Sequence, residues 1–294
     1  MALNEIQLKA LHQRFPKRRA AITGAGSGLG KALALELAKH NWTLWLNDCD
    51  GDALELIADK CGAIGKGAVV FECFDVSDLE LFISRAKLFL DNYAGVDVLF
   101  TCAGIGVGGP FVSCNPKHIR EVVDINILGT MWAVKAFVPS MIKAQKGSIV
   151  TIASAAAFHG LPHLSAYAAT KAAVVQFSET IRSELKPHNI DITTKMTTFY
   201  TSNIAEFTRG PAEEIEKARS LVQLAPWSAD QVADALLLTV QKRQFYMVAP
   251  GQAKLLWRFK RFFPQIYLRL MPAIFRSIEA KLLKKAAERS NENN

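Results

Sequence analysis

The sequence contains few cysteines, and they are not arranged as a metal site or a disulfide framework. Its five cysteines include no Cys-x-x-Cys pair, and no histidines lie at metal-ligand spacing from them. An odd number of cysteines without a secretory leader is typical of free thiols in a reducing compartment. We therefore expect no metal and a cytoplasmic location.

Long uncharged apolar runs are also missing. Residues 1–19 carry charges throughout and lack the continuous apolar core of a signal peptide, so a short amphipathic helix is the simpler interpretation. No stretch of about 18 or more uncharged apolar residues occurs, and we expect no membrane-spanning helix.

The net charge of +8 is concentrated in one segment. Residues 251–294 hold ten basic and three acidic residues, whereas the first 250 residues are almost neutral. A uniformly basic nucleic-acid-binding protein would not show this distribution, so we expect no nucleic-acid partner. We divide the chain into a Rossmann-fold catalytic and dinucleotide-binding domain, 1–250, and a basic, aromatic-rich C-terminal helical extension, 251–294.

Short apolar segments alternate with segments of helical periodicity. The expected strands are 19–23, 43–47, 68–74, 97–101, 148–152, 190–194 and 245–248. The expected helices are 29–40, one through Leu54 and Ile57, 78–93, two within 117–144, and 166–185. This alternation predicts an α/β fold, a Rossmann-type doubly wound parallel sheet of about seven strands with helices on both faces and a C-terminal helical appendage. The stretch 197–227 is the longest without an expected strand, and we interpret it as a lid.

A glycine-rich turn follows the first expected strand and precedes the first helix of the sheet. Such glycines allow a tight turn and a close approach of the backbone to a pyrophosphate, which the positive end of the helix then faces. The residues predicted to bind the cofactor here are Thr23, Gly24, Gly26, Ser27, Gly28, Leu29 and Gly30.

Asp48 follows the second strand, about twenty residues later. A carboxylate at this position accepts hydrogen bonds from the adenosine ribose hydroxyls and repels a 2′-phosphate. The next residue is Cys49 rather than a basic residue, so NAD is favoured over NADP. The alternative is a solvated turn aspartate in the acidic segment NDCDGD.

Tyr167 and Lys171 are four residues apart on one expected helix, and therefore share a face. A nearby ammonium group lowers the pKa of a phenol, which is near 10 when free. The spacing alone has little specificity, but Ser154 precedes the tyrosine by thirteen residues at the end of the fifth expected strand.

With these residues together, the chain resembles a short-chain dehydrogenase/reductase over residues 18–195. The motifs that carry the resemblance are TGAGSGLG, Asp75-Val76, TCAG at Thr101–Gly104, Asn126 within DINILGT, and GSIVTIASAAAFHGLPHLSAYAATKAA.

The resemblance implies a catalytic set of four residues, namely Asn126, Ser154, Tyr167 and Lys171. Tyr167 would act as general acid/base, Lys171 would bind the nicotinamide ribose and lower the tyrosine pKa, and Ser154 would polarise the substrate oxygen. Asn126 would hold a water in the proton relay. The resemblance also implies that Asp75 and Val76 contact the adenine, and that the following residues bind the cofactor: Cys102, Ala103, Gly104, Asn126, Tyr167 and Lys171. The implied reaction is hydride transfer between a nicotinamide and an alcohol or carbonyl carbon, in a homo-oligomer (dimer or tetramer).

Two departures from the family pattern concern the nicotinamide side of the site. The family usually has asparagine where Cys102 stands, and a weakly hydrogen-bonding thiol implies different local bracing. Where the family usually has Pro-Gly after the sixth strand, this chain has Lys195-Met196-Thr197-Thr198. His159 and His163 lie between the serine and the tyrosine, and we interpret them as substrate-loop or surface histidines rather than bases.

The C-terminal segment 251–285 combines aromatic and basic residues, and Pro264 and Pro272 should divide it into short helices. It either caps the substrate pocket or a second subunit, or makes peripheral contact with a membrane through its basic, apolar helices. Either role favours a lipophilic small-molecule substrate. We therefore expect an NAD(P)-dependent oxidoreductase. The alternative is a nicotinamide-binding scaffold or sensor that binds a membrane or a protein partner through its C-terminal segment.

Overall fold

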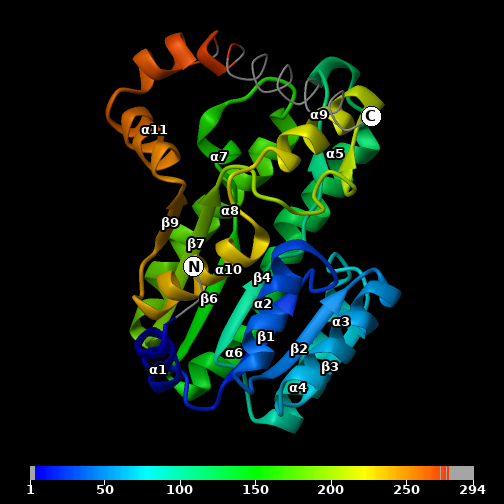
Figure 1. The fold of residues 1–294 in the computed structure, drawn as a ribbon, viewed down its shortest axis with the longest axis vertical. Helices are drawn as coiled ribbons and strands as arrows, with labels where there is room; N and C mark the ends of the chain where they lie inside the picture. The colour runs from blue at the N-terminus through cyan, green and yellow to red at the C-terminus, as the bar shows by residue number, and fades with distance from the viewer. Residues whose placement is uncertain (1–3, 272, 276, 278–294) are drawn as a thin grey trace.

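The computed structural model describes residues 4–271, 273–275 and 277, and its centre is a seven-stranded parallel sheet (Figure 1). The strand order is β3-β2-β1-β4-β6-β7-β9. The strands are β1 (Arg19–Thr23), β2 (Thr43–Asp48), β3 (Val69–Cys73), β4 (Val98–Thr101), β6 (Gly147–Ile152), β7 (Ile190–Thr197) and β9 (Tyr246–Ala249). The predicted doubly wound sheet is confirmed. Its order reverses between β1 and β4, where such sheets bind ligands.

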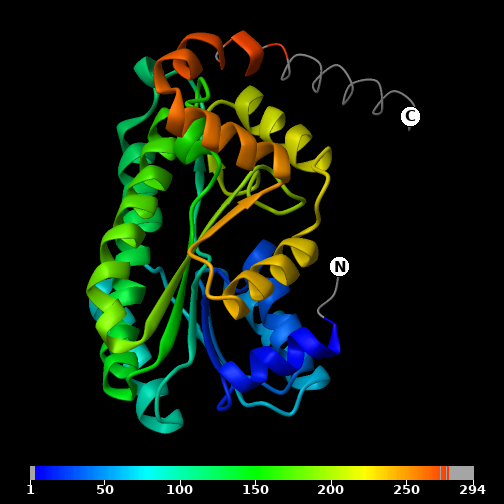
Figure 2. The same cartoon turned by 90° about the vertical axis from the view of Figure 1, so that its left-hand side faces the viewer.

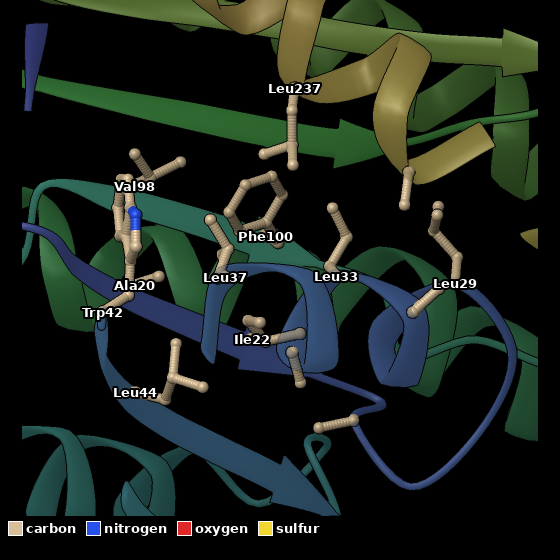
Figure 3. Close-up of a cluster of buried hydrophobic side chains, with 14 of the residues drawn as sticks. Ala20, Ile22, Leu29, Leu33, Leu37, Trp42, Leu44, Val98, Phe100 and Leu237 are labelled. Atoms are coloured by element: carbon tan, nitrogen blue, oxygen red, sulfur yellow. The ribbon is translucent and has the colours of Figure 1, made fainter. Parts of the chain in front are cut away.

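Helices cover both faces of the sheet (Figure 2). On one face lie α1 (Glu5–Arg14), α2 (Gly28–Lys39), α3 (Gly51–Ile64) and α10 (Ala229–Gln241). On the other lie α4 (Leu79–Tyr93), α6 (Thr130–Ala144) and α8 (Ser165–Leu185). Figure 3 shows Leu33 and Leu37 of α2 beside Phe100 of the sheet, with Leu237 from α10. Each fully buried leucine contributes about 1.5–3 kcal/mol relative to an exposed one.

A helical run over residues 116–144 is, among the described residues, the one helix long and apolar enough to cross a membrane. It consists of α5 (Pro116–Val123), a π-helical turn (Asp124–Gly129) and α6. Ala133, Phe137 and Met141 are completely buried against the sheet. Part of the apolar composition of this run therefore belongs to the core.

A second, two-stranded sheet was not expected from the sequence. In it β5 (Gly106–Val107) pairs in parallel with β8 (Thr208–Arg209). The prediction that the stretch 197–227 contains no strand is therefore wrong. The same stretch also forms α9 (Ala212–Gln223).

The altered residues after the sixth predicted strand lengthen that strand. β7 continues to Thr197, which pairs with Ala249, and Thr198 N donates to Ala249 O at 3.2 Å. Threonine keeps its backbone N–H and has a high strand propensity, whereas Pro-Gly would turn the chain. The ladder between β7 and β9 therefore reaches the edge of the site.

The described part of the C-terminal segment is helical, as predicted. α11 (Gly251–Phe262) ends just before Pro264, and residues 264–271 form another helical stretch. The break expected at Pro272 lies outside the described residues.

Candidate active site

A pocket opens at the carboxyl ends of the central strands. Most of the predicted cofactor-binding residues line it: Gly24, Ser27, Gly28, Leu29, Gly30, Asp48, Asp75, Val76, Cys102, Ala103 and Gly104. The remaining predicted residues, which are Thr23, Gly26, Asn126, Tyr167 and Lys171, are not among the lining residues. Thr23 Oγ1 accepts a hydrogen bond from Ala103 N at 3.1 Å, and Gly26 N donates to Asp48 Oδ2 at 2.8 Å.

The turn between β1 and α2 has room only for glycine at two positions. Gly24 has φ of +66°, and a Cβ there would lie 2.7 Å from Ala103 N. A Cβ on Gly30 would lie 2.0 Å from Gly24 O. The side chain of Ser27 makes no capping hydrogen bond to α2, whose first residues line the pocket. The first backbone N–H groups of this helix can therefore receive an anion.

The far end of the pocket is acidic. Asp48 receives Gly26 N on one oxygen and Asp50 N, at 3.1 Å, on the other. The predicted aspartate is thus fixed by the glycine-rich turn itself. Asp48 and Asp75 line the pocket, and no lysine or arginine is among the described lining residues.

Asn47, which sequence reasoning missed, is completely buried beside Asp48 and also lines the pocket. Its Nδ2 donates to Glu72 O at 3.1 Å and to Phe74 O at 3.0 Å. These bonds tie β2 to the segment after β3 and so position Asp75. A polar residue in an otherwise apolar expected strand was the available signal.

The predicted serine, tyrosine and lysine are not among the lining residues of this pocket, but Lys171 lies next to two of them, Gly104 and Ile152. The side chain of Ser154, after β6, hydrogen-bonds to Tyr167 of α8. One helical turn later, Lys171 Nζ donates to Ile152 O at 3.0 Å and lies 5.7 Å from the centroid of the Tyr167 ring. Three of the four predicted catalytic residues therefore meet where β6 ends.

Burial dominates the electrostatics of this group. It lowers the pKa of Lys171 to about 8. It raises the pKa of Tyr167, and the hydrogen bond from Ser154 opposes that rise. The tyrosine is therefore a phenol at neutral pH, which is the form that donates a proton to a substrate oxygen.

Asn126 lies in the π-helical turn and is completely buried. Its Oδ1 accepts from Ile105 N at 2.9 Å, while its Nδ2 donates to Ile105 O at 3.0 Å and to Thr170 Oγ1 at 3.1 Å. The asparagine thus links the segment after β4 to the helix that carries Tyr167 and Lys171. π-turns are frequent at functional sites because they redirect one side chain out of the helical register.

Cys102 replaces the family's asparagine without taking over its hydrogen bonds. Burial raises the pKa of its thiol to about 12, so it stays protonated. The bond from Ala103 N to Thr23 Oγ1 joins the end of β1 to the residue after Cys102.

The two histidines near the site are engaged elsewhere. His159, on the short helix α7 (Ala156–His159), is buried, and its Nδ1 lies 2.8 Å from Tyr267 Oη in the C-terminal segment. Burial lowers its pKa to about 4. His163 is exposed and pairs with Glu214 of α9.

Several lining residues come from the stretch interpreted as a lid. Tyr200, Ser202, Asn203, Ile204 and Phe207 face the pocket. The sequence does not identify these five residues, because the stretch has no periodicity or turn signal strong enough to place single side chains.

A nicotinamide dinucleotide fits these residues. The glycine positions leave a surface that any Cβ would obstruct, the amino end of α2 faces the middle of the pocket, and a carboxylate lies at one end. The phenol of Tyr167 and the ammonium of Lys171 lie 5.7 Å apart, from ring centroid to Nζ, next to Ile152 of the lining.

Comparison with known proteins agrees with this geometry. The family model described as short chain dehydrogenase matches residues 18–210. Estradiol 17-beta-dehydrogenase 11 of Homo sapiens is 31% identical over 266 residues, covering 87% of this chain and 85% of the relative.

Solved structures show the same fold. A short-chain dehydrogenase/reductase from Burkholderia phymatum in complex with NAD superposes with a TM-score of 0.80 at 26% identity, covering 86% of this chain and 96% of that one. A short-chain dehydrogenase from Sphingobium yanoikuyae in complex with NADPH gives a TM-score of 0.72 at 24% identity, covering 86% and 95%. The second likeness supports the fold alone.

Proposed function

The chain belongs to the short-chain dehydrogenase family, and on that premise we propose that it transfers hydride between a nicotinamide cofactor and an alcohol or carbonyl group of a lipophilic substrate. The observation that supports the proposal is the meeting of Tyr167, Lys171 and Ser154 at the end of β6, next to Ile152 of the pocket lining.

In this proposal, the nicotinamide supplies or accepts the hydride, and the protein moves the proton. Ser154 and Tyr167 hold the substrate oxygen, and Tyr167 Oη exchanges a proton with it. The Lys171 ammonium stabilises the phenolate left behind and binds the cofactor ribose. Asn126 fixes the helix turn beside Lys171 and holds a water of the proton relay.

NAD is the proposed cofactor in preference to NADP. Asp48 and Asp75 line the adenosine end, and no basic side chain is present among the described lining residues to receive a 2′-phosphate.

We propose both that the substrate is lipophilic and that the protein binds a membrane surface. α11 presents Leu255 and Phe262, 69% and 73% exposed, on the same side as the exposed Arg258. Exposed apolar side chains beside cations suit an interface with anionic lipid. The name of the human relative points to a steroid for that protein. A cytoplasmic protein that associates peripherally with membranes, as a homodimer or homotetramer, is the corresponding proposal.

The experiment measures turnover on a panel of long-chain and steroid-like alcohols and their ketones. The absorbance of the reduced nicotinamide reports the rate. Tyr167→Phe should lower kcat by at least about a hundredfold, because proton transfer by a placed side chain contributes roughly that much. Affinity for the nucleotide should stay within about twofold. Tyr93→Phe, on α4 away from the pocket, is the matched control.

A Tyr167→Phe variant with near-normal turnover would overturn the assigned role. Tight nucleotide binding by the wild type, with no turnover on any member of the panel, would instead favour the scaffold that uses its C-terminal segment to bind a membrane or protein.

A further inference from the structure

Lys195 is a buried charged residue near the pocket that the proposed reaction does not use. Successive strand residues face opposite sides of a sheet. Thr194 of β7 bonds to Thr151 on the α8 side, so Lys195 points to the other face. There its register partner is Ile152, which lines the pocket, and its side chain is 2% exposed.

The ammonium group of Lys195 has an aromatic neighbour in place of an anion. Its Nζ lies 4.1 Å from the centroid of the Tyr200 ring, and Tyr200 lines the pocket. Within the described part of the chain, no hydrogen bond or ion pair to a carboxylate involves this ammonium. Burying such a cation is costly, and groups of this kind concentrate at functional sites.

The two lysines approach the same strand end. Lys171 donates to Ile152 O from the α8 side, and Lys195 lies beside Ile152 on the opposite face. The pocket is lined by Asp48 at the end of β2 and by Ile152 at the end of β6, and β1 and β4 lie between these two strands. With the adenosine at Asp48, as proposed above, the nicotinamide would lie toward β6, near both ammonium groups.

We propose that Lys195 is an electrostatic residue of the cofactor site that, together with Lys171, favours the reduced nicotinamide over the oxidised one. The inference rests on the proposed binding of a nicotinamide dinucleotide. The oxidised ring carries a positive charge and the reduced ring is neutral, so a nearby cation raises the free energy of the oxidised form alone. The site therefore binds NADH in preference to NAD, and NADH is the form of the cofactor that must be bound before a carbonyl can be reduced with Tyr167 as the phenol.

The bias depends on pH, because burial and the charge of Lys171 lower the pKa of Lys195 to about 7. The titratable groups around it are Lys171 and Tyr167 on α8, Cys102 after β4, and Tyr200 after β7. The helices α2 and α10 contribute apolar side chains on this face. Lys195 is charged below about pH 7 and loses its charge above it, so the preference for the reduced cofactor weakens as the pH rises.

The test measures dissociation constants rather than turnover. NADH binding is followed by its fluorescence and NAD binding by competition, at about pH 6 and about pH 8.5. In Lys195→Met we expect NAD to bind about tenfold more tightly at the lower pH, with NADH changed less than about twofold. Lys195→Arg, which keeps the charge, should resemble the wild type. Lys254→Met removes an exposed lysine of α11 and is the control for net charge.

Equal changes in the affinities for both nucleotides, or no change in either, would overturn the inference. A second measurement needs no variant: in the wild type, the ratio of the NAD to the NADH dissociation constant should fall several-fold between about pH 6 and about pH 8.5. A flat ratio would also overturn it. If the wild type binds neither nucleotide, the proposed function itself fails, which distinguishes the two failures.

Discussion

At the scale of single residues, the pocket depends on glycines at positions where a Cβ atom would not fit. Gly30 is the clearest case, because its Cα lies directly against the carbonyl of Gly24. Gly24 in turn has a positive φ and lies against the chain after β4. These close contacts hold the start of α2 against the ends of β1 and β4.

Gly30→Ala should therefore lose nucleotide binding and become less stable. The added Cβ would lie 2.0 Å from Gly24 O, and forcing extra volume into a packed position costs about 1–3 kcal/mol. Denaturant unfolding and NADH fluorescence measure the two effects. The matched control is Gly62→Ala on α3, where nothing lies within 4 Å of the new Cβ. That substitution should raise the free energy of unfolding by about 0.4–1 kcal/mol. Normal NADH binding by Gly30→Ala would contradict the close packing of this turn.

At the scale of elements, the C-terminal helices contact the loop that follows Ser154. Lys260 Nζ of α11 donates to Phe158 O at 2.7 Å, and Tyr267 Oη lies 2.8 Å from His159 Nδ1. Tyr267 is completely buried. The interpretation of His159 as a substrate-loop residue is therefore sharpened: it is a buried contact between α7 and the extension.

Tyr267→Phe should loosen α7 while leaving the sheet intact. Loss of one buried hydrogen bond, with His159 left unpaired, costs about 1–3 kcal/mol. We expect faster proteolytic cleavage within residues 155–164 and a raised KM, with nucleotide affinity unchanged. Tyr246→Phe on β9, which instead loses a bond to Glu179 of α8, is the control. Equal cleavage rates for Tyr267→Phe and the wild type would show that the extension does not hold α7.

The sequence predicted long, periodic elements well and short, non-local ones poorly. All seven strands of the main sheet were expected, because each is an apolar segment bounded by turns. β5 and β8 have two residues each and pair across about a hundred positions, so no local pattern reveals them. β7 can extend to Thr197 because no proline interrupts it. Whether it does so depends on pairing with β9, which lies far along the chain.

The same distinction applies to the site. Ser154, Tyr167 and Lys171 follow from motif spacing, and the glycine-rich turn from its place between strand and helix. Lys195 was visible only as a departure from the family pattern. Its burial beside Tyr200 depends on which face of β7 it occupies and on a ring contributed by the following segment, and neither is encoded locally.

At the scale of the whole molecule, the extension and the active site occupy the same end. In Figure 1 and Figure 2, α11 and the helical stretch after it lie beyond the carboxyl ends of the strands, away from α4. Exposed apolar residues there include Phe262, Phe263 and Ile266. A membrane bound at this end would lie next to the substrate loop.

We expect the protein to sediment with vesicles that contain anionic lipid, and less with neutral vesicles. Leu255→Glu combined with Phe262→Glu should reduce binding at least about tenfold, since burying each side chain contributes about 1.5–3 kcal/mol and the added charges repel the lipid. Leu88→Glu, an equally apolar exposed position on α4, is the control. Equal sedimentation of all variants would remove the membrane proposal.

The bond between His159 and Tyr267 also has a consequence for biosynthesis. These residues are 108 positions apart, and chains fold from the amino end as they are translated. The loop beside Ser154 therefore acquires its final partner only after translation has passed Tyr267.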